Sequence, residues 1–330
     1  MITSRFDIND IKNEYDRIRR RNSALLDERR EEVYAKVPEI KDLELEAKLD
    51  YISQIREKIL KGKAAADNAG GRSKSDRVRQ LLSEHGYPED YLVLTYDCPL
   101  CRDTGAVNGV RCSCYNKKIT EHLLMQSNLG NVLKVENFDT FNLDYYSSQK
   151  WKNMKYSPRE NAEYALGEAK RFADSFESGE RIKGMLIYGE TGLGKTFLSN
   201  CIAERLIERG RSVLYLSANQ LFNDVIGAYL IEKKEEMKYV YELVKGAELL
   251  IIDDLGTEMT NNLVNSQLFE VINIRAREEK PTLISTNRSI EQLKERYQER
   301  ILSRILADYT VICMYGDNVR YTKRKMQLEG

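Results

Sequence analysis

Residues 189–196 read Gly-Glu-Thr-Gly-Leu-Gly-Lys-Thr, which matches a glycine, four variable residues and then Gly-Lys-Ser/Thr. An apolar run at 185–188 precedes this motif, and apolar residues at helical spacing follow it in 197–209. The motif therefore lies between a predicted buried strand and the start of a helix. A glycine-rich turn at a helix start is the alternative interpretation, but the strand-motif-helix order favours a phosphate-binding loop.

The residue types of this motif suit the binding of a nucleoside triphosphate. Glycines let backbone N–H groups surround a phosphate, and a helix N-terminus adds partial positive charge. We expect Lys195 to reach the β- and γ-phosphates and the Thr196 hydroxyl to bind Mg²⁺. The predicted nucleotide-binding residues are Gly189, Glu190, Thr191, Gly192, Leu193, Gly194, Lys195 and Thr196.

A second motif follows about sixty residues later, where four apolar residues at 249–252 end in Asp253 and Asp254. A core strand that ends in two aspartates is common, but after a phosphate-binding loop it indicates a hydrolytic site. We expect Asp253 to hold Mg²⁺ and Asp254 to orient or deprotonate the attacking water. Asn287 ends a further predicted strand, 281–287, from which it would contact the γ-phosphate or that water.

Predicted strands and helices alternate from residue 184 to residue 315. This order predicts a three-layer α/β domain with a parallel sheet, and ligand would bind at the carboxyl ends of its strands. Three arginines, Arg296, Arg300 and Arg304, follow on a helical stretch, and Arg320 lies after the last strand. Arginine suits γ-phosphate charge, especially from a neighbouring subunit, whereas a surface salt bridge is the simpler role for any one of them.

Length and composition limit the remaining possibilities. A chain of 330 residues predicts roughly two domains, and an apolar content of 42% is enough for a core. The 52 basic and 52 acidic residues cancel, so net charge gives no sign of a nucleic-acid or membrane partner. No apolar run approaches the length of a membrane span, and the first residues lack a signal-peptide core. We therefore expect a cytoplasmic protein without a membrane partner.

Four of the six cysteines fall close together, as Cys98, Cys101, Cys112 and Cys114. Two close pairs across a short loop suit a tetrahedral zinc site with a structural role. The second pair is tighter than the usual Cys-X-X-Cys, so His122 is retained as a substitute ligand. An iron–sulfur cluster and free or redox-active thiols are the alternatives.

Residues 1–61 carry two amphipathic helical patterns that meet near Pro38, which predicts a helical hairpin or a small bundle. This hairpin either docks a protein partner or packs on its own chain. Residues 62–76 are rich in Gly, Ala and Ser and predict a linker, with non-specific phosphate contact as a lesser alternative, and 77–85 predict a short helix. The expected division is a helical partner-docking region at 1–61, linker and short helix at 62–97, zinc module at 98–125, connector at 126–155 and ATPase domain at 156–330.

The chain resembles the bacterial replicative-helicase loaders of the DnaC/DnaI type, which are AAA+ ATPases, and the IstB transposition helpers. The resemblance covers roughly 156–330. Its motifs are GETGLGKT (189–196), LLIIDDLG (249–256), ISTNRS (284–289), ERILSRI (299–305) and GDNVR (316–320). CPLCRDTG (98–105) and CSC (112–114) are similar to the zinc module of the DnaI-like branch, whereas 1–97 match only as an N-terminal helical region.

The resemblance implies an ATPase that loads a hexameric replicative helicase onto single-stranded DNA, assembles through its ATPase domain and uses ATP, Mg²⁺ and Zn²⁺. Asn287 is similar in position to the sensor-1 residue, Arg320 to the sensor-2 arginine, and Arg304 to the arginine finger that acts across a subunit boundary, with Arg300 as an alternative. The second acidic residue is Asp254, where AAA+ proteins usually have glutamate. The shorter side chain suggests slow hydrolysis that DNA or a partner regulates.

Two other functions remain open at this point. An IstB-like transposition helper would work with a transposase, but such helpers generally lack the four-cysteine segment. A nucleotide-gated adaptor that does not hydrolyse ATP is the other, and the presence of Lys195, Asp253 and Asp254 argues against it.

Overall fold

The computed structural model describes residues 8–61, 69–126, 129–233, 235–259 and 261–329. Its contacts divide the chain into two compact units. One unit covers Lys12–Val110, and the other covers Arg111–Gly330 together with the residues up to Ile11. Among the described residues, no helix combines the length and the apolar character needed to cross a membrane.

The second unit is built on a five-stranded sheet with the strand order β4-β5-β6-β3-β7. The strands are β3 (Gly184–Tyr188), β4 (Val213–Ser217), β5 (Leu249–Asp253), β6 (Thr282–Thr286) and β7 (Tyr309–Cys313). All four pairings are parallel, and β3 lies between β6 and β7, with Met185 opposite Leu283 on one side and Thr310 on the other. Parallel strands need helices on both faces, which explains why β3 and β5 are almost wholly apolar.

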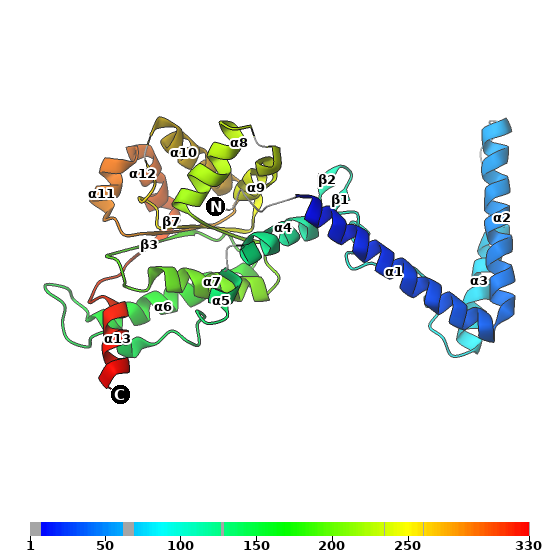
Figure 1. Cartoon of the computed structure of the whole chain (residues 1–330), viewed down its shortest axis with the longest axis horizontal. Helices are drawn as coiled ribbons and strands as arrows, with labels where there is room; N and C mark the ends of the chain where they lie inside the picture. The colour runs from blue at the N-terminus through cyan, green and yellow to red at the C-terminus, as the bar shows by residue number, and fades with distance from the viewer. Residues whose placement is uncertain (1–7, 62–68, 127–128, 234, 260, 330) are drawn as a thin grey trace. The chain divides into compact units, whose positions relative to one another are not determined.

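Helices cover both faces of this sheet and complete the three layers (Figure 1). One face carries α6 (Pro158–Asp174) and α7 (Lys195–Glu208), whose buried alanine and leucine side chains pack with Met185 and Ile187 of β3. The other carries α8 (Ala228–Leu230), α9 (Glu235–Gly246), α10 (Asn262–Arg277), α11 (Ile290–Arg296) and α12 (Glu299–Asp308). The predicted three-layer α/β fold with a parallel sheet is confirmed.

Shorter elements join these layers. Before α6 come the helices α4 (Ser113–Gln126) and α5 (Leu129–Leu133) and a 3₁₀ turn, η1 (Leu143–Tyr145). A second 3₁₀ turn, η2 (Ser175–Glu177), directly follows α6. The last helix, α13 (Val319–Glu329), follows β7. The residue pattern of 219–246 predicts one of the alternating helices of this domain. In the structure a π-helix, η3 (Gln220–Gly227), comes first, and Lys233 adopts a left-handed conformation at φ 55° before α9. That backbone conformation ends a right-handed helix, so the prediction of one continuous helix is wrong.

The first unit contains α1 (Ile8–Lys36) from Lys12 onward, α2 (Pro38–Lys61) and α3 (Ala69–Glu84), and Pro38 begins a helix as predicted. Its core joins Val33, Val37 and Ile40 to Leu81 and Leu82 of α3. In Figure 1, α3 runs beside α2. The sequence predicted a helix here only at 77–85, so the helix that packs beside α2 begins earlier than expected. The predicted linker falls partly in this helix and otherwise on 62–68, which lie outside the described residues.

Part of the apolar pattern of α2 is solvent-exposed. Ile40 is fully buried at its start, but Tyr51 and Ile55 are 59% and 40% exposed. Leu45, Leu49 and Ile52 on the same helix are also more than half exposed. Apolar side chains grouped in this way on one helix are typical of a surface that contacts a partner.

Candidate nucleotide-binding and metal sites

The loop at 189–194 joins β3 to α7, and the residues after β7 brace it. A Cβ atom on Gly189 would lie 2.1 Å from the Met314 carbonyl oxygen, and one on Gly192 would lie 2.2 Å from Oδ1 of Asn318. The Val319 N–H also donates to the Gly192 carbonyl at 2.8 Å. Both glycines have positive φ, of 147° and 85°, so packing and backbone conformation each exclude a side chain there.

Tyr146 fixes the far end of the loop from a segment well before it in the sequence. Its buried hydroxyl donates to the Leu193 carbonyl at 2.9 Å, and its ring stacks on Phe141 with centroids 5.7 Å apart. Burial raises the pKa of Tyr146, so the hydroxyl stays protonated as a donor. A Cβ atom on Gly194 would lie 2.5 Å from this hydroxyl oxygen. The loop is therefore shaped by contacts before any ligand binds.

Replacing Tyr146 by phenylalanine is expected to weaken ATP binding several-fold, because the Leu193 carbonyl loses its buried donor. Leaving such a group unsatisfied costs about 1–3 kcal/mol, part of which appears as a less ordered loop. Isothermal titration with ATP and Mg²⁺ measures the affinity, and Tyr164→Phe at an exposed position of α6 is the matched control. Equal affinities for the two variants would show that the hydroxyl does not shape the loop.

Lys195 is the first residue of α7, and its ammonium group contacts the phosphate-binding loop at 189–194. Its Nζ donates to the carbonyl oxygens of Gly189 at 2.8 Å and Glu190 at 2.7 Å. Burial lowers the pKa of Lys195, while the charges of Asp254 and Asp253 partly oppose that shift. A phosphate group bound in the loop would supply the negative charge that this buried cation lacks.

Asp253 is the last residue of β5, and its carboxylate lies beside the Thr196 hydroxyl. Its Oδ1 accepts hydrogen bonds from the Thr196 hydroxyl at 3.3 Å and from the Ser285 hydroxyl. Burial raises the pKa of Asp253, and these two hydrogen bonds oppose the rise. A hydroxyl and a buried carboxylate are ligands that Mg²⁺ accepts, so this pair fits the metal.

Asp254 follows with a φ of 55°, so the chain turns sharply at the end of β5. Its backbone N–H donates to the Ser285 hydroxyl at 3.0 Å, which fixes this turn. Successive residues of a regular strand point to opposite faces. The turn thus gives the two aspartates different surroundings, with Asp253 buried against Thr196 and Asp254 lining the adjacent cavity.

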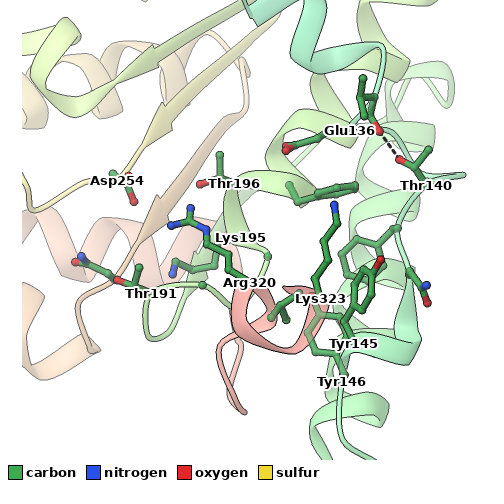
Figure 2. Close-up of a pocket in the computed structure, with 18 residues that line it drawn as sticks. Glu136, Thr140, Tyr145, Tyr146, Thr191, Lys195, Thr196, Asp254, Arg320 and Lys323 are labelled. Atoms are coloured by element: carbon green, nitrogen blue, oxygen red, sulfur yellow. Dashed lines mark hydrogen bonds between the residues drawn. The ribbon is translucent and has the colours of Figure 1, made fainter. Parts of the chain in front are cut away.

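A cavity of about 530 Å³ brings the predicted nucleotide residues together. Figure 2 shows Thr191, Lys195, Thr196, Asp254 and Arg320 turned toward it. Asn287 also lines the cavity, and its buried Oδ1 has no hydrogen-bond partner within the described residues. An unsatisfied buried amide oxygen at the carboxyl end of β6 fits a site that a polar ligand or water completes.

One wall of the cavity comes from residues 136–146, which fall in the segment predicted to be a connector. Glu136, Phe141, Tyr145 and Tyr146 all line the cavity. Phe141 also meets Phe197 of α7 edge to face, with centroids 5.6 Å apart. Aromatic rings beside a phosphate-binding loop can stack a nucleotide base. The aromatic residues between 138 and 146 were the sequence signal for this wall, but nothing in their spacing linked them to the loop.

The arginine-finger candidates do not line the described cavity. Arg304 projects from α12 and pairs with Asp308, with Nε 3.1 Å from Oδ2. Arg300 lies over the Phe269 ring with its guanidinium carbon 4.2 Å from the centroid, which gives it a packing role within the chain. Arg320 is the predicted arginine that the fold brings to the cavity, through the first turn of α13, and Lys323 on the same helix joins it (Figure 2).

The clustered cysteines form a second candidate site. One sulfur from each of Cys98, Cys101, Cys112 and Cys114 lies within 4.8 Å of the others, and none of them forms a disulfide. Thiolates at about 2.3 Å from a zinc ion would be spaced in this range, so the group fits tetrahedral zinc. His122 is not part of the group found among the described residues. Cys201 is buried in the sheet unit, where burial raises the pKa of its thiol.

The turn that carries the first cysteine pair is built around the buried carboxylate of Asp103. Its oxygens accept from the backbone N–H groups of Cys98 at 2.8 Å and Asp97 at 3.1 Å. The Asn22 side chain of α1 donates to the same carboxylate at 3.0 Å. A carboxylate that accepts three N–H groups orders the loop in advance of any metal.

The sheet order, the braced loop and the aspartate and asparagine at neighbouring strand ends define a three-layer α/β domain with a phosphate-binding loop. Residues 154–311 match the family model described as the bacterial DnaA ATPase domain. The chain is similar to the replicative helicase loader DnaC of Escherichia coli K12, at 23% identity over 141 residues, which are 43% of this chain and 56% of DnaC. It is also similar to the loader DnaI of Bacillus subtilis 168, at 26% over 163 residues, 46% of this chain and 51% of DnaI.

The matches thus span only about half the length of these loaders. Among solved structures, a DnaI crystal structure aligns at 26% identity with a TM-score of 0.41, covering 51% of this chain and 88% of that one. A DnaC helicase-loader structure aligns at 22% with a TM-score of 0.43, covering 54% and 98%. DnaA from Aquifex aeolicus with bound AMPPCP aligns at 19% with a TM-score of 0.45, covering 59% and 55%.

Proposed function

We propose that the chain is an ATP-dependent loader of the replicative DNA helicase onto single-stranded DNA. The observation that carries this proposal is the convergence of the phosphate-binding loop, Asp254, Asn287 and Arg320 on one cavity. The sequence similarity to two proteins named as replicative helicase loaders supports the choice of function. In this proposal ATP binding and hydrolysis time the grip on the helicase and its release.

The proposed hydrolytic roles follow from the positions of the side chains. Lys195 binds the β- and γ-phosphates, and Thr196 and Asp253 hold Mg²⁺, which supplies positive charge against the phosphates when bound. Asp254, on the cavity wall, orients the attacking water and accepts its proton. Its side chain is one methylene shorter than a glutamate, so we propose slow hydrolysis that DNA or the helicase accelerates.

Three further residues would interact with the γ-phosphate or with the attacking water. We propose that Asn287 hydrogen-bonds to one of these two groups, because its unsatisfied Oδ1 belongs to a residue that lines the cavity. Arg320 would contact the γ-phosphate from α13. Arg304, exposed on α12, would complete the cavity of a neighbouring copy as an arginine finger, and this role requires assembly through the ATPase domain.

The helical region and the zinc module would connect the nucleotide site to the helicase. We propose that the exposed apolar residues of α2, including Leu45, Leu49 and Ile52, dock the hexameric helicase. We retain the division into a docking region at 1–61, a linker and short helix at 62–97, a zinc module at 98–125, a connector at 126–155 and an ATPase domain at 156–330. Zn²⁺ would have a structural role in its module.

The test mixes the full chain with the replicative helicase, ATP, Mg²⁺ and single-stranded DNA, and measures complex mass and helicase loading. Asp254→Asn is expected to assemble the complex but to lower ATP hydrolysis about 100-fold, because the water loses its proton acceptor. Leu49→Asp is expected to prevent assembly while hydrolysis without helicase stays unchanged. The exposed change Leu328→Asp on α13 is the matched control for added charge.

Two outcomes would contradict this proposal. If wild type and Asp254→Asn are equally inactive under all conditions, the chain binds ATP as an adaptor without hydrolysing it. If the chain retains a transposase and not the helicase, it is a transposition helper.

A further inference from the structure

A loop between η1 and α6 carries an unusual combination of side chains that no role above uses. Residues 147–156 contain Lys150, Trp151, Lys152, Lys155 and Tyr156, and Trp151 is the only tryptophan of the chain. Between Asp144 and Glu160 there is no acidic residue. The loop is therefore a local basic patch on a chain whose net charge is zero.

The loop has ordered ends and an exposed surface. The Arg159 N–H donates to the Ser147 carbonyl at 3.0 Å, which brings the two ends together, and the Tyr315 hydroxyl donates to the Tyr156 carbonyl at 3.1 Å. Tyr156 and Met154 are 49% and 42% exposed, and all three lysines are exposed. In Figure 1 the chain runs out from the sheet unit just before α6. The loop thus presents its lysines and Tyr156 to solvent from a fixed base, and Trp151 is partly exposed.

The lysines and rings are paired. The Lys152 ammonium lies 5.4 Å from the Trp151 ring centroid, and Lys155 lies 5.0 Å from that of Tyr156. Within the described residues none of the three loop lysines forms an ion pair. The nearby acids are engaged, since Asp144 binds Arg159 at 2.9 Å and Glu160 caps α6 through Ser157. The Glu160 carboxyl, whose pKa is lowered mainly by its hydrogen bonds with Ser157, also interacts with the charge of Lys150. The loop therefore offers positive charge without ion-paired partners beside aromatic faces.

We propose that this loop binds single-stranded nucleic acid, with Trp151 and Tyr156 stacking bases and the three lysines contacting phosphates. Such binding combines a cationic track with aromatic side chains on which successive bases stack. A protein partner would be expected to meet a more continuous apolar surface, whereas here lysines alternate with the rings. The assignment rests on the proposed action on single-stranded DNA and gives that DNA its contacts.

The loop is also adjacent in sequence to residues that line the nucleotide cavity. Tyr145 and Tyr146, which line that cavity, directly precede it. At its other end, Pro158 packs against Gly316, where a Cβ atom would lie 2.8 Å from the proline Cβ. Residues 314–319 in turn brace the phosphate-binding loop. DNA on the loop would thus be held by the same segments that shape the ATP site.

The test titrates the full chain, with ATP and Mg²⁺ present, with an oligothymidylate and follows Trp151 emission and fluorescence anisotropy of labelled DNA. Quenching of Trp151 and saturable binding are expected. The triple change of Lys150, Lys152 and Lys155 to alanine should weaken binding at least about tenfold. It should also make the negative slope of log affinity against log salt less steep, by about 2. Trp151→Ala should weaken binding about tenfold, and Trp151→Phe should retain most of it.

The control variant changes three exposed lysines of the helical unit, Lys12, Lys41 and Lys48, to alanine and should bind DNA as wild type does. Unchanged affinity and salt slope in the loop variants, with wild-type binding intact, would overturn this assignment and leave the proposed loading function standing. Trp151 emission that responds to the helicase and not to DNA would make the loop a protein contact and also overturn it. If wild type binds no single-stranded DNA at all, the DNA part of the proposed function fails as well.

Discussion

Replacing Lys195 by alanine is expected to abolish ATP hydrolysis and to lower ATP affinity at least about 100-fold. The ammonium group is buried among the loop carbonyls of Gly189 and Glu190, so no other side chain can take its position without moving the loop. Arg320 and Lys323 also line the cavity, but they come from α13. Phosphate release and binding of a fluorescent ATP analogue measure the two effects.

Thermal unfolding separates lost binding from lost folding in this variant. A ligand at 100 times its dissociation constant stabilises a protein by about 2.7 kcal/mol, so ATP should raise the melting temperature of wild type and not that of Lys195→Ala. Lys294→Ala removes an exposed lysine that pairs with Glu299, and it should retain the full shift. A normal ATP-induced shift in Lys195→Ala would contradict the proposed role of the loop.

Replacing Cys101 by serine is expected to remove zinc from the purified protein and to disorder the segment around the cysteines. Structural zinc contributes about 10–16 kcal/mol in small zinc modules, far more than such a short segment gains from its own core. Elemental analysis of the full chain should find about one zinc per wild-type chain and none in the variant. Hydrogen exchange should show faster exchange of the amides from Asp97 to Thr104.

The control for this experiment is Cys313→Ser, because Cys313 lies in β7 outside the cysteine group. It should retain zinc and normal exchange in the cysteine segment. The Asp103 carboxylate holds the amides of Asp97 and Cys98 by itself, so protection there should fall in Cys101→Ser but not vanish. Iron with visible absorption in wild type, or six titratable thiols without metal, would show that the site does not bind zinc.

Prediction from the sequence succeeded where chemistry restricts a short stretch to few residue types. The phosphate-binding loop requires glycines that reach positive φ, and Gly189, Gly192 and Gly194 all do so. The strand that ends in Asp253 has only apolar residues before it, because both faces of a parallel sheet are covered. Four cysteines at this spacing likewise predicted a cluster, and the sulfur positions agree with it.

Prediction was weaker where distant contacts decide the conformation. The interruption of 219–246 by a π-helix and a left-handed Lys233 has no strong sequence signal, since the apolar spacing continues through it. The apolar pattern of α2 left open whether the helix packs on its own chain or contacts a partner, and in the structure Tyr51 and Ile55 are exposed. Periodicity shows which residues share a helix face but not whether another element covers that face.

The parallel α/β fold, the phosphate-binding loop, the two aspartates at the end of β5 and the cysteine group could be predicted from the sequence alone, because each depends on local spacing. The surroundings of the loop depend instead on contacts between distant parts of the chain. Tyr146 and Asn318 contact it from positions remote in the sequence, and the aromatic wall at 141–146 faces it across the cavity. Such contacts arise from packing between elements, and the local spacing of residues carries no record of them.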